Sequence, residues 1–377
     1  MNRRMRLEYQ ADRLEATLAS HKVRTRVAGG TVTPRFVRFD LLPEPGTRIQ
    51  RIAALAEEMA LSLNASTCRV FRRGGRVQVE VPREDPRQVR FAPLCARLRQ
   101  IPACTALLGL DEEGVPVLLR LPSADVAHVL ISGNTGSGKT VLARTMALSL
   151  AMHNHPREVQ LVLIDPKRRG FGMLGELPHL LTPPIHEPGR AGRVLARLVE
   201  DMEQRDRYGR STPRIVVFID ELADLMMVGG GEVDGPLTRL AQRGREAGIH
   251  LVACTQRPAA SVIGGLVKSN FPVRVVGSVA SAEDAKVAAG LPKTGAERLL
   301  GKGDFLVVAR GEQLRVQGAY ASASEIRRAV ARMCRQPSGG GSVRGGVGGR
   351  AADVTRRVSA TARQLAHRLP ALAGVGR

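Results

Sequence analysis

The stretch Ile131–Leu150, ISGNTGSGKTVLARTMALSL, decides the fold of this chain. Its middle part, Gly133–Thr140, fits the pattern G-x-x-x-x-G-K-[ST], in which a glycine-rich loop holds the phosphates of a nucleoside triphosphate. The run before it, Ala127–Ile131, is apolar and predicts a buried strand, whereas Val141–Leu150 repeats apolar residues at helical spacing. Because the pattern lies between a strand and a helix, the sequence predicts a phosphate-binding loop rather than an ordinary turn.

The residues of this loop have separable tasks in binding a nucleotide. Gly133, Gly136 and Gly138 let the backbone turn so that its N–H groups face phosphate oxygens, and the following helix adds its positive N-terminal end. We expect Lys139 to reach the β- and γ-phosphates and the hydroxyl of Thr140 to hold Mg²⁺. The predicted cofactors are therefore a nucleoside triphosphate and Mg²⁺. The predicted nucleotide-binding residues are Gly133, Asn134, Thr135, Gly136, Ser137, Gly138, Lys139 and Thr140.

Composition limits the class of protein. The chain has 377 residues with a hydrophobic content of 43%, enough for two or three domains with cores of ordinary size. No apolar run approaches the roughly 18–20 residues of a membrane span, and the N-terminus MNRRMRLEYQ has no apolar core of a secretory signal behind it. The cysteines are scattered and form no C-x-x-C pair, which favours a cytoplasmic protein without disulfides or structural zinc. They are Cys68, Cys95, Cys104, Cys254 and Cys334.

The charge of the chain points to a polyanionic partner. The formal net charge is +22, and the excess of basic residues extends over the whole chain and is densest in residues 336–377. Such an excess favours phosphate contacts with a nucleic acid, and the alternative is a basic but merely solvated surface. Aromatic residues make up 3% and Trp is absent, which argues against the stacking platforms that bind single strands.

The sequence predicts a small α+β domain over residues 1–120. Arg6–Ser20 carries an apolar face at helical spacing, and Ile49–Leu63 also has a helical pattern. Arg35–Leu41 and Arg76–Val81 alternate apolar and polar residues, which is typical of half-buried strands.

Residues 121–335 alternate apolar runs with helical patterns, which predicts an α/β domain around a mostly parallel sheet. Residues 322–335 form one more predicted helix, which begins at Ser322 or Ser324. Residues 336–349 have the composition of a Gly-rich linker, and residues 350–377 form a basic tail that contains a possible short helix. The predicted buried strands are Val126–Ser132, Val159–Asp165, Ile215–Asp220, His250–Thr255, Val273–Ser278 and Gly303–Val308.

Two carboxylates supply the second half of the predicted nucleotide site. The strand pattern RIVVFIDE delivers Asp220 and Glu221 to the C-terminal edge of the sheet, where ligands bind in such folds. We assign Asp220 to the Mg²⁺ shell, through water, and Glu221 to polarising the attacking water. Gln256, at the end of another apolar run, is a weaker candidate for sensing the γ-phosphate. Spacing alone gives Arg245 no more than an exposed surface position, although an arginine on a neighbour's site can neutralise charge in the transition state.

Several segments, in order and spacing, resemble the motor domain of the FtsK/SpoIIIE DNA translocases. The region Val32–Ala65 resembles the smaller domain that precedes the motor in that family, and the resemblance covers about residues 7–335. The motor segments are GNTGSGKTV, LIDPK (Leu163–Lys167), LPHLLTP (Leu177–Pro183), IVVFIDELADLMM (Ile215–Met227), LAQRGREAGIHLVACTQRP (Leu240–Pro258), VIGGLVKSNFPVR (Val262–Arg274) and GAERLLGKGDFLV (Gly295–Val307).

The resemblance implies a RecA-like motor that assembles as a homo-hexameric ring around double-stranded DNA, with ATP hydrolysed between subunits. It matches Arg245 with the arginine that reaches the neighbouring subunit's nucleotide, and Gln256 with the residue that senses the γ-phosphate in the family. One departure is Ala282, which stands where the family usually has a lysine. Another is the run RRGFG after LIDPK, in which Arg168 and Arg169 either touch phosphates in the pore or are simply exposed.

Parts found in septal members of that family have no counterpart here. We find no N-terminal membrane domain, and residues 350–377 are too few for a C-terminal winged helix. The tail adds DNA affinity, docks on a partner or an anionic membrane, or is a disordered end. Recruitment to the membrane or the division site would then depend on another protein.

With the nucleotide site predicted from the residues, the resemblance implies an ATP-driven translocase of double-stranded DNA, in chromosome segregation or in transfer of a mobile element. Two alternatives stay open. One is a motor that moves a polypeptide, as related ATPases of type VII secretion do, and the other is a DNA-binding scaffold with an inactive motor.

Overall fold

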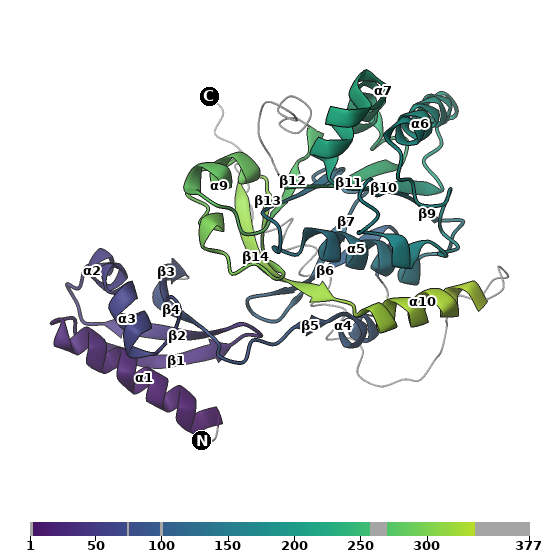
Figure 1. Cartoon of the computed structure of the whole chain (residues 1–377). Helices are drawn as coiled ribbons and strands as arrows, with labels where there is room; N and C mark the ends of the chain where they lie inside the picture. The colour runs from purple at the N-terminus through teal and green to yellow at the C-terminus, as the bar shows by residue number, and fades with distance from the viewer. Residues whose placement is uncertain (1–2, 74, 99–100, 257–269, 336–377) are drawn as a thin grey trace, which may run out of the picture. The chain divides into compact units, whose positions relative to one another are not determined.

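The computed structural model describes residues 3–73, 75–98, 101–256 and 270–335 (Figure 1). The chain divides into two compact units, Met1–Gln88 and Val89–Arg377. This division lies earlier than the boundary that we predicted at residue 120, because the strands of residues 105–120 pair with the large sheet. The predicted linker and tail, residues 336–377, lie outside the described residues.

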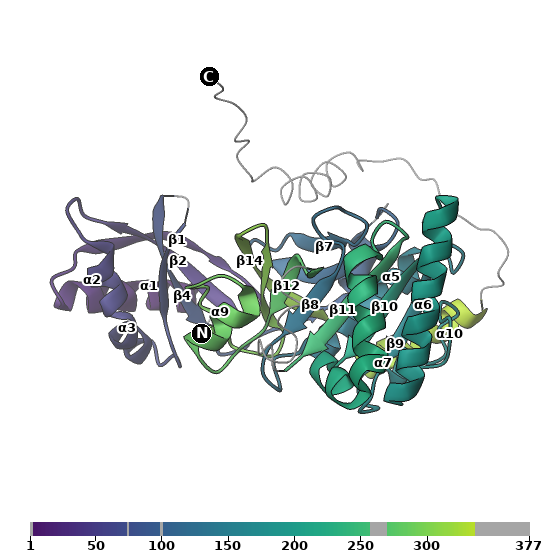
Figure 2. The same cartoon turned by 90° about the horizontal axis from the view of Figure 1, so that it is seen from above.

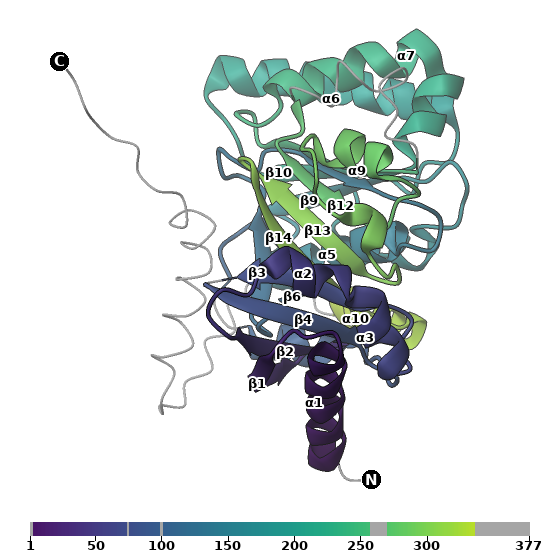
Figure 3. The same ribbon diagram turned by 90° about the vertical axis from the view of Figure 1, so that its left-hand side faces the viewer.

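The small unit is an antiparallel sheet with helices packed on one face. The strand order is β1-β2-β4-β3, and Figure 3 shows these strands side by side. Alternate residues of β2 and β4, such as Phe39 and Val79, pack against Leu14, Ile52 and Met59 of the three helices. The predicted helix 49–63 is interrupted at Leu55 and forms two helices. The elements are α1 (Arg3–Ser20), β1 (Thr25–Val32), β2 (Phe36–Pro43), α2 (Ile49–Ala54), α3 (Ala56–Ser62), β3 (Arg69–Arg73) and β4 (Arg76–Pro82).

The large unit is built on one mixed sheet. Along the path β7-β6-β14-β13-β12-β8-β11-β10-β9, the last five strands run parallel and the first four extend them in antiparallel fashion. The strands are β5 (Val89–Arg90), β6 (Thr105–Asp111), β7 (Pro116–Arg120), β8 (Val129–Ser132), β9 (Val159–Ile164), β10 (Arg214–Asp220), β11 (Ile249–Thr255), β12 (Val273–Val276), β13 (Asp304–Ala309) and β14 (Glu312–Tyr320). The carboxyl ends of the parallel strands therefore meet at one edge.

Helices cover both faces of the parallel part. Figure 1 shows α6 and α7 on one side of the sheet and α5 on the other, and Figure 2 shows α6 and α7 lying alongside each other. None of the described helices is both long and apolar enough to span a membrane. The helices are α4 (Phe91–Arg97), α5 (Lys139–His153), η1 (Gly172–Leu174), α6 (Pro188–Tyr208), α7 (Leu222–Arg243), α9 (Ala282–Ala289), η2 (Ala296–Arg298) and α10 (Ala323–Arg335).

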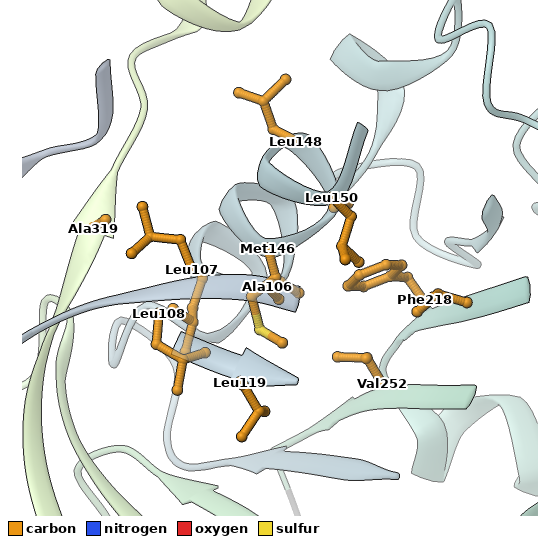
Figure 4. Close-up of a cluster of buried hydrophobic side chains, with 14 of the residues drawn as sticks. Ala106, Leu107, Leu108, Leu119, Met146, Leu148, Leu150, Phe218, Val252 and Ala319 are labelled. Carbon is orange, nitrogen blue, oxygen red and sulfur yellow. The ribbon is translucent and has the colours of Figure 1, made fainter. Parts of the chain in front are cut away.

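The helix that follows the phosphate loop, α5, lies at the centre of the core. Its Met146 and Leu150 belong to the same buried cluster as Phe218 of β10 and Val252 of β11, and on its other side it meets Leu107 of β6 (Figure 4). A helix that is buried on several sides needs apolar residues around its whole circumference, which explains the run VLARTMALSL. The loop at its N-terminus is therefore anchored to the buried core of the unit.

Most predicted elements of the large unit are found, with boundary shifts of a few residues. The six predicted strands correspond to β8–β13, but β13 is antiparallel to both of its neighbours, contrary to the parallel arrangement that we expected. The start of α10 at Ser322 is confirmed by a capping box, because Ser322 Oγ accepts from Glu325 N at 3.3 Å while Glu325 Oε2 accepts from Ser322 N at 2.8 Å. The α/β fold class is also confirmed.

Candidate nucleotide-binding site

The phosphate loop connects β8 to α5 and depends on glycines for its shape. Gly133, Gly136 and Gly138 have φ values of 143°, 83° and 103°, which other residues rarely adopt. The ammonium group of Lys139 donates to Gly133 O at 2.7 Å and to Asn134 O at 3.0 Å. Burial lowers the pKa of Lys139, while nearby carboxylates oppose that shift. The predicted loop residues thus form one compact turn at the carboxyl edge of the sheet.

Thr140 and Asp220 come together across the site, although they are far apart in the sequence. Thr140 Oγ1 donates to Asp220 Oδ1 at 2.7 Å, because β10 ends beside the first turn of α5. Burial raises the pKa of Asp220, and the hydrogen bond from Thr140 opposes that rise. A hydroxyl and a carboxylate are hard oxygen donors, and together with phosphate oxygens and water they suit Mg²⁺. The pair therefore fits the metal that the sequence predicted.

A second acidic residue shapes the loop that closes over this pair. Asp165 follows β9 and is fully buried, and its carboxylate accepts from three main-chain N–H groups, those of Arg169, Gly170 and Phe171, at 2.8–3.2 Å. The resulting tight turn brings Gly170 so close to Asp220 that a Cβ on Gly170 would lie 2.7 Å from Asp220 Oδ2. The side chains of Arg168 and Arg169 are exposed on the outside of this turn.

Glu221 lies directly after Asp220 and is held by the neighbouring strand. Its Oε1 accepts from Thr255 Oγ1 and from the Gln256 N–H, both at 3.1 Å. Glu221 is 6% exposed and has a φ of 81°, a left-handed conformation that non-glycine residues adopt rarely and that marks functional sites. Its carboxylate is thus fixed at the edge of the site by two donors from the end of β11.

Gln256 reaches the phosphate loop itself. Its Oε1 accepts from Thr135 Oγ1 at 2.9 Å, while its main-chain N–H donates to Glu221. Gln256 therefore connects the end of β11, the carboxylate of Glu221 and the tip of the phosphate loop. From this geometry its side chain is suited to respond to a group bound in the loop.

Arg245 lies away from the other predicted site residues. It is exposed in the turn between α7 and β11, so it precedes the amino end of β11, whereas the phosphate loop follows the carboxyl end of the parallel strand β8. The seven residues of β11 span about 20 Å at roughly 3.3 Å per residue. Arg245 and the phosphate loop of the same chain therefore lie at opposite edges of the sheet.

The turn that carries Arg245 is tightly built. Ile249 N donates to Gly244 O at 2.7 Å, and Arg205 Nη1 donates to Ala247 O at 3.1 Å. A Cβ on Gly248 would lie 2.1 Å from Ser211 O, so only glycine fits there. The main chain beside Arg245 is therefore fixed while its side chain is free to meet another molecule.

Sequence reasoning missed several contributors to the site. Thr255, which donates to Glu221, and Gly170, which packs on Asp220, carry no local signal for these roles. Asp165 stands in the LIDPK segment at a strand end, a position that could have drawn attention to it. Ala282, at the position of the family's usual lysine, is exposed at the start of α9.

The sequence also matches models of known protein families. The model of the FtsK/SpoIIIE family matches residues 97–211 and 205–260, and the model of the FtsK alpha domain matches residues 1–83. The chain belongs to the FtsK/SpoIIIE family. It is 35% identical over 356 residues to DNA translocase FtsK of Sporosarcina ureae, a match that covers 86% of this chain and 45% of that protein. It is 37% identical over 360 residues to DNA translocase SftA of Bacillus subtilis strain 168, covering 88% of this chain and 37% of SftA. The chain thus spans less than half the length of these relatives.

Solved structures with the same fold are more distant in sequence. The monomer form of the pCW3 conjugation coupling protein TcpA with ATPγS superposes with a TM-score of 0.61 at 20% identity, and the match covers 87% of this chain and all of TcpA. The cytoplasmic domain of the type VII secretion ATPase EccC from Thermomonospora curvata gives a TM-score of 0.54 at 23% identity, over 63% of this chain and 32% of EccC. At these identities the likeness concerns the fold alone. As a member of this family, the chain is an ATPase homologue with a P-loop site.

Proposed function

We propose that this protein is an ATP-driven motor that moves double-stranded DNA and works as a hexameric ring. The observation that carries the proposal is the meeting of Thr140, Asp220 and Glu221 at one edge of the sheet beside the phosphate loop. Family membership and the net charge of +22 support DNA as the substrate, because DNA is a polyanion and the similar proteins FtsK and SftA are DNA translocases.

In this proposal the phosphate loop binds the triphosphate through its main-chain N–H groups and through Lys139. Thr140 and Asp220 would hold Mg²⁺, which neutralises charge on the β- and γ-phosphates. Glu221 orients and polarises the attacking water, and its two donors, Thr255 and the Gln256 N–H, keep the carboxylate in place. Gln256, through its contact with Thr135, responds to the state of the γ-phosphate.

Arg245 acts on the site of a neighbouring subunit in this proposal. Arg245 is exposed and lies at the edge of the sheet opposite its own phosphate loop, which supports a role at the nucleotide of an adjacent copy. There its guanidinium would stabilise the transferring phosphoryl group. Hydrolysis is then coupled between subunits, which is what a ring needs to pass DNA along in steps.

The proposed contacts to DNA fall on phosphates. The motor should therefore move along DNA of any sequence, and its affinity for DNA should fall as the salt concentration rises. The low aromatic content argues for a duplex rather than for stacked single strands. ATP and chromosomal or mobile-element DNA share the cytoplasm, so the proposed reaction takes place there. The cellular task is either chromosome segregation or transfer of a mobile element, with any membrane or division-site recruitment supplied by another protein.

The deciding experiment measures ATP hydrolysis by the purified protein with and without long linear duplex DNA, at low and moderate salt. Glu221→Gln serves as the background control, and single-stranded DNA serves as the substrate control. We expect strong stimulation by duplex that fades with salt, and ATP-dependent displacement of a third strand from a triplex substrate. Hydrolysis that ignores DNA would contradict the proposal and favour a polypeptide substrate. Binding of duplex without any hydrolysis would instead favour a scaffold.

A further inference from the structure

The loop that precedes β13 is hydrogen-bonded to the phosphate loop. We call the segment Leu300–Gly303 the brace loop. Lys302 N donates to Gly136 O at 3.1 Å, and Gly303 N donates to Ser137 O at 2.8 Å. The approach is close, because a Cβ on Gly138 would lie 3.0 Å from Gly303 N. The two loops therefore form a single hydrogen-bonded unit.

These two bonds fix the direction of phosphate-binding groups. In a trans peptide the C=O and the following N–H point in opposite directions. When the carbonyls of Gly136 and Ser137 are bonded to the brace loop, the N–H groups of Ser137 and Gly138 must point away from it, toward the inside of the phosphate loop. Ser137 N indeed donates inward, to Asn134 O at 3.2 Å. The brace loop thus presets donors that would otherwise have to be oriented when a nucleotide binds.

A buried ion pair holds the brace loop in turn. Arg315 of β14 forms two parallel bonds to Asp304, Nε to Oδ1 at 2.9 Å and Nη2 to Oδ2 at 2.8 Å. The same carboxylate accepts from Leu300 N at 2.9 Å, so it closes both ends of the brace loop. Gly318 N of β14 also donates to Gly303 O at 2.7 Å. Asp304 is 1% exposed, so the two parallel bonds are shielded from water and hold Arg315 and Asp304 in one geometry.

We propose that Asp304 and Arg315 are positioning residues for nucleotide binding, which act through the brace loop and never touch the nucleotide themselves. The inference deepens the proposed function, on which it rests only in that the phosphate loop binds ATP. It assigns a task to the antiparallel hairpin β13–β14, which contributes no residue to the predicted chemistry. Preorganising the loop lowers the cost of binding rather than the barrier to the chemical step.

The test compares the pair with a buried ion pair elsewhere in the chain. Arg315→Lys keeps the charge but cannot make the two parallel bonds, and Asp304→Asn keeps the shape. Arg38→Lys and Glu80→Gln alter the buried pair Arg38–Glu80 of the small unit, which has no place in the nucleotide site. For each variant we would measure the thermal midpoint, the affinity for a fluorescent ATP analogue, and kcat and KM for ATP.

We expect Arg315→Lys and Asp304→Asn to raise Kd and KM for ATP about tenfold, with kcat changed less than about twofold, since one or two ordered hydrogen bonds are lost. The Arg38 and Glu80 variants should lower the thermal midpoint and leave KM unchanged.

Two results would overturn the inference: an unchanged KM in folded Asp304 or Arg315 variants, or a fall in kcat alone. Should Arg315→Lys not fold, Asp304→Asn decides. Analogue binding needs no DNA and no hydrolysis, so its outcome is independent of whether the proposed DNA motor activity is found.

Discussion

Thr140 and Asp220 are joined by a 2.7 Å hydrogen bond, and Gly170 packs against both side chains. A Cβ at Gly170 would lie 2.7 Å from Asp220 Oδ2 and 3.2 Å from Thr140 Cγ2. The Asp220 side chain is short and hydrogen-bonded to Thr140, so it cannot move away from an added Cβ without breaking that hydrogen bond. The turn built by Asp165 therefore limits the position of the proposed metal ligands.

Gly170→Ala should impair the site while leaving the fold intact. We expect a loss of ATP hydrolysis of about tenfold or more, since a displaced metal ligand weakens stabilisation of the phosphoryl transition state. The measurement is hydrolysis rate against Mg²⁺ concentration, where the variant should need more Mg²⁺. Gly172→Ala is the matched control, because a Cβ there meets nothing within 4 Å. Equal behaviour of the two variants would contradict this role for Gly170.

Glu221→Gln should abolish hydrolysis and spare ATP binding. The amide can still accept from Thr255 and from the Gln256 N–H, but it cannot polarise water as a carboxylate does. Loss of a general base typically costs about 10²–10⁴ in rate. Single-turnover hydrolysis and equilibrium binding of ATP would separate the two effects. The exposed Glu232→Gln serves as the control, and persistent turnover in Glu221→Gln would remove Glu221 from its proposed role.

Arg245→Ala alone should hydrolyse ATP about 10³-fold more slowly than the unaltered protein. A mixture of Arg245→Ala with Glu221→Gln should regain part of the activity. In mixed rings, an intact site of the first variant meets an intact arginine of the second, which random assembly places at about a quarter of interfaces. Hydrolysis by the mixture is the readout. Arg243→Ala, which removes a bond to Asp206 in the same region, should hydrolyse ATP normally. A mixture no more active than its components would argue against action between subunits.

Acid should destabilise the large unit through two buried histidines. Burial lowers the pKa of His128 to about 3 and of His250 to about 4. Between those values and the unfolded pKa near 6.5, the unfolded chain binds more protons, so stability falls as pH falls. The expected loss is about 1 kcal/mol per histidine between pH 7.5 and 5.5, measured by urea unfolding. His128→Gln should flatten this dependence, and an unchanged slope would contradict the assignment.

The parallel half of the fold could be predicted from the sequence because the patterns that specify it are local. Each of the runs behind β8 to β11 is apolar and is followed by residues of the site. The position of Asp220 and Glu221 at the carboxyl edge could be predicted because they end a strand of a parallel sheet. The phosphate loop likewise carries its own pattern. These features depend on neighbours in the chain rather than on distant partners.

The antiparallel half of the sheet could not be predicted, because its strand pairing joins segments that are distant in the sequence. The small domain predicted over residues 1–120 includes the residues of β6 and β7, whereas Gly109 of β6 pairs with Gly318 of β14 in the large sheet. A Cβ on Gly109 would lie 2.0 Å from Gln317 O, a close approach that no local pattern announces. The contacts of the brace loop and the bond between Thr135 and Gln256 are equally long-range. Geometry of this kind emerges only when the strands are assembled.

The place of Arg245, across the sheet from its own phosphate loop, has a consequence for how the protein is handled. If each complete hydrolytic centre needs two copies, activity per molecule depends on protein concentration, and dilution acts as an inhibitor. Specific activity should then rise with concentration until assembly is complete. A long duplex that gathers several copies would act as a scaffold for assembly as well as a track, and would lower the concentration at which that plateau is reached.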